Sequence, residues 1–573
     1  MKLRRMIAIW AAKIISAACR LSGKQGVTFA GKVALRIDPN ILKDLSAQVR
    51  EKIFVVCGTN GKTTTNNLLC QAIETEASAK PMAKKSAGQN NGNHGQKNHG
   101  QSVRVVCNHT GSNMLDGVAA AFVLAAKNDG TLDADYACIE IDEASTLRVF
   151  PHFKPDYMVL TNLFRDQLDR YGEIDITMDM LNRAMQMAPD MKIIVNADDA
   201  LSAYLAMESG HEFITYGITE RVFSEEEQGE QHEIREGRFC KKCGARLDYE
   251  FYHYSQIGKY NCPNCDFTRP EIDFEALHID MTEGLSFDVL ERYLLPEEEL
   301  DSVVTIDDAA AGDGTGLDHE EEAAATREEA DDKAGISDNG AEEKTDIDAG
   351  KDRIIHRYES RHLSADYRGF YNIYNILAAY AAGRSAGLKL ADYEKVLKDF
   401  HPQNGRMEHF NINGSDVMLN LAKNPAGFNQ NISAVMEDKK EKDIIIVIND
   451  NAQDGTDISW LWDVDFDRFG DRKDCESVKP NADSELKNAD SKYDSVNADP
   501  SVNMIRSITV SGIRCQDMRL RMKYVDIPCE MIGDVKSAIE ARLADGCGNL
   551  YVLVNYTALF STRNILAGMQ EAK

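Results

Sequence analysis

The stretch Ile53–Thr65, which reads IFVVCGTNGKTTT, decides the fold of this chain. It begins as a short apolar run typical of a buried strand, passes through a glycine-containing turn, and enters a predicted helix at about Thr63. Backbone N–H groups in such a turn point towards phosphate oxygens, Lys62 supplies positive charge, and the hydroxyl of Thr63 is a suitable ligand for Mg²⁺. Val56 replaces the first glycine of the strict phosphate-loop pattern. The placement between strand and helix nevertheless predicts an ATP site.

Apolar runs that end in polar residues recur after this stretch, with helical sequence between them. This alternation is typical of a parallel sheet with crossover helices. The predicted fold class is therefore α/β, with a central parallel sheet that carries the phosphate loop and a smaller C-terminal α/β domain. The first set of predicted strands covers residues 136–141, 157–161 and 193–196, and the second set covers residues 444–448, 507–511 and 550–554.

The length of the chain supports more than one domain. Its 573 residues, 43% of them hydrophobic, are too many for a single core. We place a boundary after a predicted helix over 374–386. The predicted organisation is an N-terminal helix and lead-in over 1–50, an ATP-binding domain over 51–398 and a C-terminal α/β domain over 399–573.

Three segments have the composition of insertions that join no core, and we expect disorder or loops in all of them. Residues 81–104 are rich in Asn, Gly, His and Gln, residues 296–350 are acidic, and residues 473–501 repeat Asn-Ala-Asp. For His94 and His99 in the first segment, a solvated loop is favoured over a metal-binding tract.

The charge of the chain bears on its partners. The formal net charge is −28, and residues 296–350 contribute −17 of it through 20 acidic and 3 basic residues. The remaining charge is ordinary for an enzyme. A protein that binds nucleic acid needs basic residues gathered on one face, and no such concentration appears, so we expect no nucleic-acid partner.

Four of the thirteen cysteines form two C-x-x-C pairs, at Cys240, Cys243, Cys262 and Cys265. Two such pairs at this separation are typical of a zinc ribbon, in which four thiolates surround Zn²⁺ and leave no position for water. We therefore predict a structural zinc site within residues 236–270. The odd number and the scatter of the cysteines favour a reducing compartment, so we expect a cytoplasmic protein.

The N-terminal sequence MKLRRMIAIWAAKIISAACRLSG has a basic start and an apolar middle, but Lys13 interrupts the apolar run. It is therefore expected neither to span a bilayer nor to serve as a signal peptide. Its apolar residues recur roughly at helical spacing beside basic residues. Two interpretations remain: a helix packed on its own domain, which is favoured, and a peripheral helix on the inner face of the membrane.

The form G-T-N-G-K-T-T resembles the Mur ligase family, whose members are ATP-dependent amide-forming enzymes of peptidoglycan synthesis. Further motifs of that family follow in order at 139–145, 160–169 and 371–379. The resemblance implies that Glu140 helps to hold Mg²⁺ and that Asn372 lies near the adenine. Gln167 stands where the family has a histidine, which leaves the metal contact at that point open. The implied cofactor-binding residues are Gly58, Thr59, Asn60, Gly61, Lys62, Thr63, Thr64, Glu140 and Asn372.

The C-terminal motifs at 405–408, 423–429 and 449–460 resemble one branch of that family, the ligase-like subunits of lipid II isoglutaminyl synthases. This resemblance implies amidation of the α-carboxyl of D-glutamate in the lipid II stem peptide to D-isoglutamine, through an acyl phosphate. It also implies a GatD-type glutamine amidotransferase partner that supplies ammonia.

In that pair the ligase-like subunit is thought to present an aspartate to the cysteine and histidine of its partner. Asp457 is the first candidate, Asp454 the second and Asp450 the third. Each is equally compatible with a turn or a helix cap. Cys547, within Asp-Gly-Cys-Gly, is interpreted as a turn cysteine and not as a glutaminase nucleophile.

Two other functions remain as alternatives. A Mur or folylpolyglutamate-type ligase that adds a whole amino acid is disfavoured by Gln167 and by the C-terminal motifs. A non-catalytic scaffold for a glutaminase is disfavoured by the intact Lys62, Thr63 and Glu140.

Overall fold

The computed structural model describes residues 2–21, 26–79, 103–109, 111–165, 174–223, 236–282, 284–294, 343–344, 356–366, 368–400, 405–451, 458–470 and 505–571. The three predicted insertions lie outside these residues, except for 103–104 and 343–344. Gln167, Asp454 and Asp457 also lie outside them.

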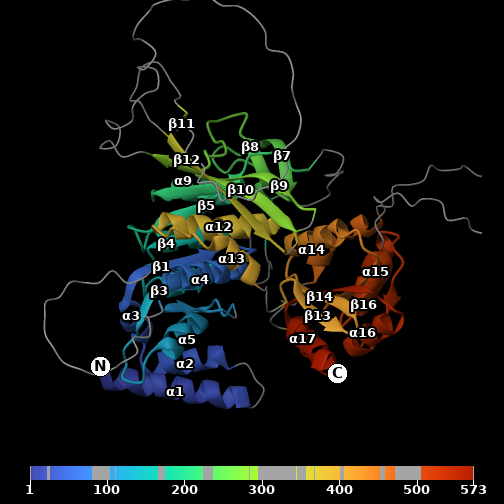
Figure 1. The fold of residues 1–573 in the computed structure, drawn as a ribbon, viewed down its shortest axis with the longest axis horizontal. Coiled ribbons are helices and arrows are strands. Elements are labelled where there is room, and N and C mark those ends of the chain that lie inside the picture. The colour runs from blue at the N-terminus through green and yellow to red at the C-terminus, as the bar shows by residue number, and fades with distance from the viewer. Residues whose placement is uncertain are drawn as a thin grey trace, which may run out of the picture.

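A ten-stranded sheet forms the larger part of the molecule, in the order β11-β12-β10-β9-β6-β5-β4-β1-β3-β2 (Figure 1). The seven strands from β9 to β2 pair in parallel, and β10, β12 and β11 extend the sheet in antiparallel fashion. The strands are β1 (Val49–Cys57), β2 (Val105–Cys107), β3 (Ala134–Glu140), β4 (Tyr157–Leu160), β5 (Lys192–Asn196), β6 (Phe213–Ile218), β9 (Phe274–Asp280), β10 (Leu285–Leu294), β11 (Glu343–Lys344) and β12 (His356–Ala365).

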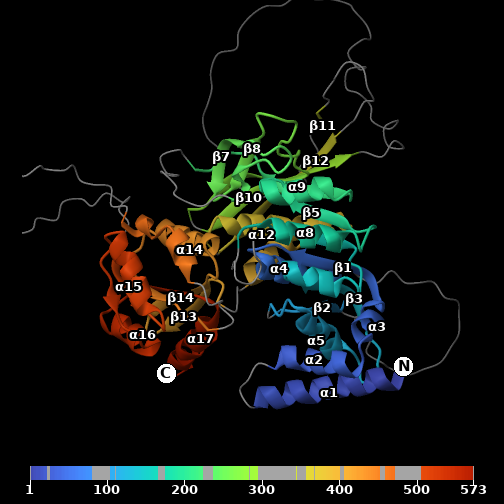
Figure 2. The ribbon, with the colours of Figure 1, turned by 180° about the vertical axis from the view of Figure 1, so that it is seen from behind.

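Helices cover both faces of this sheet because its central strands are apolar on both sides (Figures 1 and 2). One face packs against α4 (Lys62–Ala79), α12 (Tyr371–Ser385) and α13 (Tyr393–Asp399). The opposite face packs against α3 (Ile41–Ser46), α5 (Leu115–Ala125), α6 (Thr146–Val149), α8 (Ile174–Met185) and α9 (Ala200–Glu208). On that side α2 (Val27–Ile37) contacts α5, and α1 (Lys2–Leu21) contacts α2, so these two helices form an additional outer layer.

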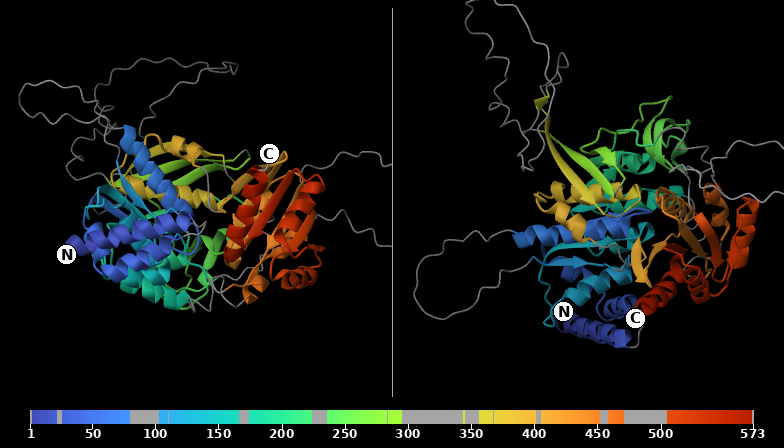
Figure 3. Two further views of the ribbon diagram at one scale, coloured as in Figure 1. Left: turned by 90° about the horizontal axis from the view of Figure 1, so that it is seen from below. Right: turned by 45° about the vertical axis from the view of Figure 1, so that its right-hand side comes forward.

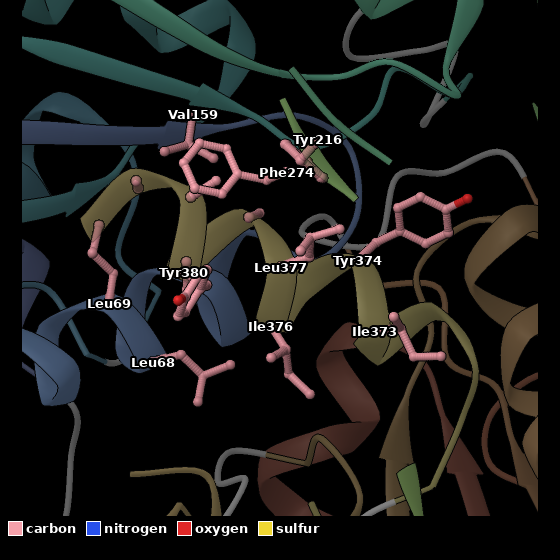
Figure 4. Close-up of a cluster of buried hydrophobic side chains, with 14 of the residues drawn as sticks. Leu68, Leu69, Val159, Tyr216, Phe274, Ile373, Tyr374, Ile376, Leu377 and Tyr380 are labelled. Carbon is pink, nitrogen blue, oxygen red and sulfur yellow. The ribbon is translucent and has the colours of Figure 1, made fainter. Parts of the chain in front are cut away.

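Helix α12 is the centre of one core. Its residues from Asn372 to Gly383 are all buried. Figure 4 shows Leu377 and Tyr380 of this helix between side chains of α4, such as Leu68, and side chains of the sheet, such as Phe274. Residues that follow α4 by some three hundred positions therefore complete the packing around the helix that begins at the phosphate loop.

A six-stranded sheet forms the second part of the molecule, in the order β13-β14-β18-β15-β16-β17. All neighbours pair in parallel except β13 and β14. Helices α14 and α15 cover one face, and α16 and α17 cover the other. The elements are β13 (Glu408–Ile412), β14 (Ser415–Leu421), α14 (Pro425–Glu437), β15 (Lys442–Val447), β16 (Ile505–Ser511), α15 (Cys515–Tyr524), β17 (Glu530–Met531), α16 (Val535–Ala544), β18 (Asn549–Val554) and α17 (Tyr556–Glu571).

The structure confirms the predicted strands of both sheets and the helix after the phosphate loop. The predicted helix over 374–386 exists but begins earlier, at Tyr371. The large sheet has an antiparallel extension that the sequence analysis did not anticipate. Among the described residues, none of the helices has both the length and the apolar character that crossing a membrane requires.

Candidate active site

The phosphate loop joins the end of β1 to the start of α4, and its two glycines have positive φ values. Gly58 has φ +120° and Gly61 has φ +86°. A Cβ atom on Gly61 would lie 2.1 Å from Oδ1 of Asn375, and one on Gly58 would lie 2.3 Å from Oγ1 of Thr161. Only glycine combines this backbone conformation with such close neighbours.

The loop is anchored to the segment that follows β4. The N–H of Thr59 donates to the carbonyl oxygen of Asn162 at 2.8 Å, and the N–H of Asn60 donates to its side-chain oxygen at 2.9 Å. The Thr59 hydroxyl donates to the carbonyl oxygen of Phe164 at 3.1 Å and accepts from its N–H at 2.9 Å. The Leu-Thr-Asn motif thus fixes the shape of the loop from a neighbouring strand.

Lys62 begins α4 and is almost fully buried. Its Nζ donates to the carbonyl oxygen of Gly58, to that of Thr59 at 3.2 Å, and to Oε1 of Glu143 at 3.0 Å. Burial acts to lower the pKa of Lys62, but the charge of Glu143 and the acidic groups near it outweigh burial and raise that pKa. Lys62 is therefore a charged ammonium group at the N-terminal end of α4.

Glu140, at the end of β3, lies beside the first turn of α4. Its Oε2 accepts a hydrogen bond from the Thr63 hydroxyl at 2.6 Å, and its Oε1 accepts one from Nδ2 of Asn113 at 3.1 Å. Asn108 holds the backbone of Glu140 on both sides, since its Oδ1 accepts from the Glu140 N–H at 2.9 Å and its Nδ2 donates to the Glu140 carbonyl oxygen at 2.8 Å. Sequence reasoning missed Asn108 and Asn113.

A cleft of about 460 Å³ lies between the two sheets and contains these groups. This volume is within the usual range for a small-molecule site. The cleft brings together every predicted cofactor-binding residue except Gly58, which lies at the start of the phosphate loop. The predicted residues that line it are Thr59, Asn60, Gly61, Lys62, Thr63, Thr64, Glu140 and Asn372.

Asn372 enters the cleft from the first turn of α12. Its Nδ2 donates to the carbonyl oxygen of Arg368 at 2.8 Å, and its Oδ1 accepts from Nδ2 of Asn375 at 3.0 Å. Asn375 is also the residue that packs closely on Gly61. The predicted adenine-side residue and the phosphate loop are therefore connected through one asparagine pair.

The segments before β13 and after β14 contribute cations to the cleft. Arg406 and Lys423 line it together with Asn420 and Tyr556. Burial lowers the pKa of Arg406, and the negative charge of Glu140 opposes that shift; a guanidinium nevertheless keeps its proton at neutral pH. Arg406 lies in a motif that the sequence analysis used only for the resemblance, without assigning it to the site.

The three candidate aspartates follow β15. Asp450 forms an ion pair with Arg514 at 2.5 Å, while Asp454 and Asp457 lie outside the described residues. Immediately before the latter two, Nδ2 of Asn451 donates to Oγ1 of Thr557 at 2.9 Å. Thr557 lines the cleft, so the segment with the first two candidates begins at the cleft wall.

The four predicted zinc ligands come together in the structure. The Sγ atoms of Cys240 and Cys265 are 3.6 Å apart, and those of Cys243 and Cys262 are 3.5 Å apart. A tetrahedral site with four thiolates has sulfur–sulfur edges of about 3.8 Å, so the residues fit Zn²⁺. The cluster lies beside the hairpin of β7 (Asp248–Tyr254) and β8 (Ile257–Asn261), and its core packs on α9.

We expect purified protein to contain about one zinc per chain at this cluster. Cys240→Ser should release the metal and speed hydrogen exchange of the β7–β8 amides, because the thiolates hold the two knuckles together. Zinc content by mass spectrometry and amide exchange would measure both. Cys515→Ser, at a half-buried cysteine of the other sheet, is the matched control. Metal-free wild-type protein with unchanged exchange would contradict the assignment.

Two other cysteine features have different surroundings. Cys547 lies between α16 and β18, its Sγ donates to the carbonyl oxygen of Asn549 at 2.8 Å, and burial raises the pKa of its thiol to about 12. This environment disfavours a nucleophilic thiolate, in agreement with the interpretation of Cys547 as a turn cysteine.

Cys70, Cys107 and His109 form a second group of possible metal ligands, with ligand atoms within 4.8 Å of one another.

Comparison with known sequence families agrees with this geometry. Residues 56–266 match the Mur ligase middle domain. Residues 421–483 and 490–559 match the family described as MurT ligase C-terminal. The fold and the phosphate site therefore define a Mur ligase-like protein.

Within that class the chain resembles MurT, over nearly its whole length. It is 29% identical over 561 residues to the MurT subunit of lipid II isoglutaminyl synthase (glutamine-hydrolyzing) of Staphylococcus aureus strain COL, covering 97% of this chain and 96% of the relative. It is 27% identical over 556 residues to the same subunit of Streptococcus pneumoniae, covering 95% and 93%. The resemblance predicted from the sequence motifs is confirmed.

Solved structures support the fold. A pseudomurein peptide ligase type C from Methanothermus fervidus superimposes with a TM-score of 0.54 at 16% identity, covering 91% of this chain and 79% of the other. MurF from Acinetobacter baumannii superimposes with a TM-score of 0.51 at 12% identity, covering 94% and 80%.

Proposed function

We propose that this protein is the ligase subunit of a glutamine-dependent lipid II amidating enzyme, which converts the α-carboxyl of D-glutamate in the stem peptide to D-isoglutamine. The observation that carries the proposal is the cleft between the sheets. It brings Lys62, Thr63 and Glu140 together with Arg406 and Lys423, in a chain similar to MurT over 97% of its length.

The chemistry follows from the poor leaving group of a carboxylate. Transfer of the γ-phosphoryl group of ATP to the carboxylate gives an acyl phosphate, which ammonia attacks to form the amide and release phosphate. Two cations neutralise charge on the transferring phosphoryl group: Lys62, from the domain of the large sheet, and Arg406, from the domain of the small sheet. Asn372 and Asn375 position the nucleotide at the start of α12.

The residues around Thr63 fit a magnesium ion. The Thr63 hydroxyl and the Glu140 carboxylate, 2.6 Å apart, are the hard oxygen donors that Mg²⁺ prefers. Mg²⁺ held there would neutralise phosphate charge. Asn113 and Asn108 hold Glu140 in the orientation that this role needs.

Free ammonia is scarce at neutral pH, which favours a partner that releases it from glutamine beside the cleft. We propose a GatD-type glutaminase subunit as that partner, with Asp457, or else Asp454, completing its cysteine and histidine pair. The start of their segment at the cleft wall, through Asn451 and Thr557, supports delivery of ammonia into the site. The ion pair of Asp450 with Arg514 makes that aspartate the least suitable of the three.

The proposed division into domains keeps the boundary at 398–399, at the C-terminal end of α13 (Tyr393–Asp399), which packs on the large sheet. The first strand of the small sheet, β13, begins nine residues further on, at Glu408. The active site then lies between the ATP-binding and C-terminal domains. We also propose that the protein works in the cytoplasm, where ATP and the lipid-linked precursor are both accessible.

Product analysis tests the proposal. Protein supplied with ATP, Mg²⁺, lipid II and ammonium chloride should form D-isoglutamine-containing lipid II and release phosphate in equal amount. A ligase that adds a whole amino acid would instead need that amino acid and give a heavier product by mass spectrometry. A scaffold would hydrolyse no ATP under any of these conditions. Either result would contradict the proposal.

Deletion of residues 301–350 should leave amidation and thermal stability nearly unchanged. The deleted segment connects β10 to β12, and Leu294 at the end of β10 pairs directly with His356 at the start of β12. The two strand ends are therefore adjacent, and of the residues that the structure describes the deletion removes only the two-residue edge strand β11. Turnover and thermal midpoint, compared with the full chain, would measure the effect. Loss of folding would show that the acidic segment has a structural role.

A further inference from the structure

Helix α1 has two apolar faces, and only one of them is covered. Ala8, Ile9, Ala12 and Ser16 are buried against the rest of the domain. The opposite face has large apolar side chains that are exposed to solvent. Helix α1 itself is the outermost layer of the molecule on this side (Figures 1 and 3). These side chains are Leu3, Ile7, Trp10, Ile14 and Leu21, with exposed fractions of 70%, 49%, 51%, 69% and 91%.

The spacing makes the exposed side chains one continuous stripe. Relative to Leu3 they stand at i+4, i+7, i+11 and i+18, which is one side of a helix with 3.6 residues per turn. Phe29 of α2, 56% exposed, is a further large apolar side chain exposed on the two-helix layer. Isolated apolar residues are common on protein surfaces, but a stripe along a whole helix marks an interaction surface.

The charged residues of the two-helix layer, α1 and α2, have one sign. Helix α1 contains five basic residues and no acidic one, and α2 contains two basic residues and no acidic one. This contrasts with the formal net charge of −28 of the whole chain. Helical spacing places Lys2 and Arg20 along one edge of the stripe and Arg4 along the other. Lys13 contacts the protein itself, since its Nζ donates to the carbonyl oxygen of Ala126 at 2.5 Å and to Oδ1 of Asn128 at 3.2 Å. Arg5 lies on the inner side, where it pairs with Asp44.

We propose that α1, together with Phe29, docks on an anionic phospholipid surface with its axis in the plane of the membrane. The apolar stripe would enter the boundary between headgroups and acyl chains, and the basic edges would contact phosphate groups. Trp10 has the side chain that prefers this boundary. A second copy of the chain fits less well, because pairing two such stripes would bring two sets of basic edges together.

The docking surface adjoins the active-site cleft. Val27 and Thr28, at the start of α2, line the cleft, while Phe29 follows them on the exposed surface. A membrane that holds α1 therefore lies at the rim of the cleft on this side. This step rests on the proposed function: a lipid-linked acceptor would extend its peptide into the cleft while its lipid stays in the bilayer.

Vesicle flotation tests the docking itself. The full chain should float with vesicles that contain both phosphatidylcholine and phosphatidylglycerol. It should not float when the vesicles contain phosphatidylcholine alone. Ile7→Glu combined with Ile14→Glu should lower the partition coefficient by about tenfold or more, since the change removes apolar area and adds negative charge. Ile176→Glu, on the 48% exposed Ile176 of α8, is the matched control and should float like the wild type. Equal thermal midpoints would show that all variants fold.

The proposal fails if the wild type does not bind anionic vesicles. It also fails if the double variant floats with these vesicles to the same extent as the wild type. It also fails if sedimentation shows that the wild type is a dimer and the double variant a monomer, while neither protein binds vesicles. The stripe would then be a contact between two copies of the chain. With ammonium chloride as nitrogen source, the double variant should lose amidation of lipid II in vesicles and keep amidation of a short-chain, water-soluble analogue. Vesicle binding could behave as expected while neither the wild type nor any variant amidates either acceptor. In that case the docking proposal is supported and the proposed function is wrong.

Discussion

Lys62→Ala should reduce ATP-dependent amidation by about 10³-fold or more, because it removes the only lysine of the phosphate loop from the transferring phosphoryl group. Product formation from lipid II, ATP and ammonium chloride measures this effect without any need for a glutaminase. Near-normal amidation by the variant would overturn the assignment of the phosphate loop.

The structure adds a condition to this experiment. Lys62 pairs with Glu143, which is also buried, so the single substitution removes the ammonium group 3.0 Å from this carboxylate and leaves only the weaker interaction with Lys423. Breaking a buried pair in this way costs about 3–5 kcal/mol. Burial already raises the pKa of Glu143, so this group would take up a proton and recover part of that loss. The loss should therefore be larger at high pH, where the proton is harder to bind, than at low pH.

The double variant Lys62→Ala with Glu143→Gln separates chemistry from folding. It removes the unpaired charge, so its thermal midpoint should approach that of the wild type while amidation stays as low as in Lys62→Ala. Restored amidation in the double variant would mean that Lys62 acts on the fold and not on the phosphoryl group.

Asp457→Asn should lower glutamine-driven amidation by roughly 10⁴-fold, the order of effect seen when the acidic member of a catalytic triad loses its charge. The reason is that the carboxylate is proposed to orient a histidine of the partner subunit. Amidation with ammonium chloride should remain normal, since the ligase chemistry needs only the nucleophile. The two nitrogen sources, compared in the same complex, measure the two half-reactions separately.

Asp450→Asn is the matched control for that experiment. Asp450 belongs to the same motif, but its carboxylate pairs with Arg514, so both nitrogen sources should continue to work. If ammonium fails to rescue Asp457→Asn, that residue belongs to the ligase site or to the fold. If glutamine works normally in Asp457→Asn, Asp454 becomes the candidate and the same comparison decides.

The phosphate loop and the zinc ribbon were predictable because the whole signal is local. Each depends on a few residues at fixed spacing, and neighbouring turns bring them together whatever the rest of the chain does. The pairing of β10 with β12 was not predictable in this way. These two antiparallel strands are separated in sequence by residues 295–355, so no short turn marks their pairing. The other antiparallel pair, β9 and β10, is joined by the short connection 281–284, and that local signal was missed.

The support around Glu140 was missed for a similar reason. Asn108 reaches Glu140 because β2 pairs with β3, with Cys107 opposite Cys138. A single asparagine after a three-residue strand has no local pattern that reveals this register. The place of Arg406 in the cleft was harder still to predict from the sequence, because it depends on how the two domains lie against each other.

The close approach of Gly61 to Asn375 has a consequence for how the protein is made. The loop is synthesised early, but the asparagine that fits against it emerges from the ribosome more than three hundred residues later. At translation rates of about 5–20 residues per second, this delay is roughly 15–60 s. During that time α4 lacks its partner α12, and apolar side chains such as Leu68 and Leu69 remain uncovered. For that interval the nascent chain exposes apolar surface of the nucleotide-binding half, the kind of surface that promotes aggregation and that chaperones bind.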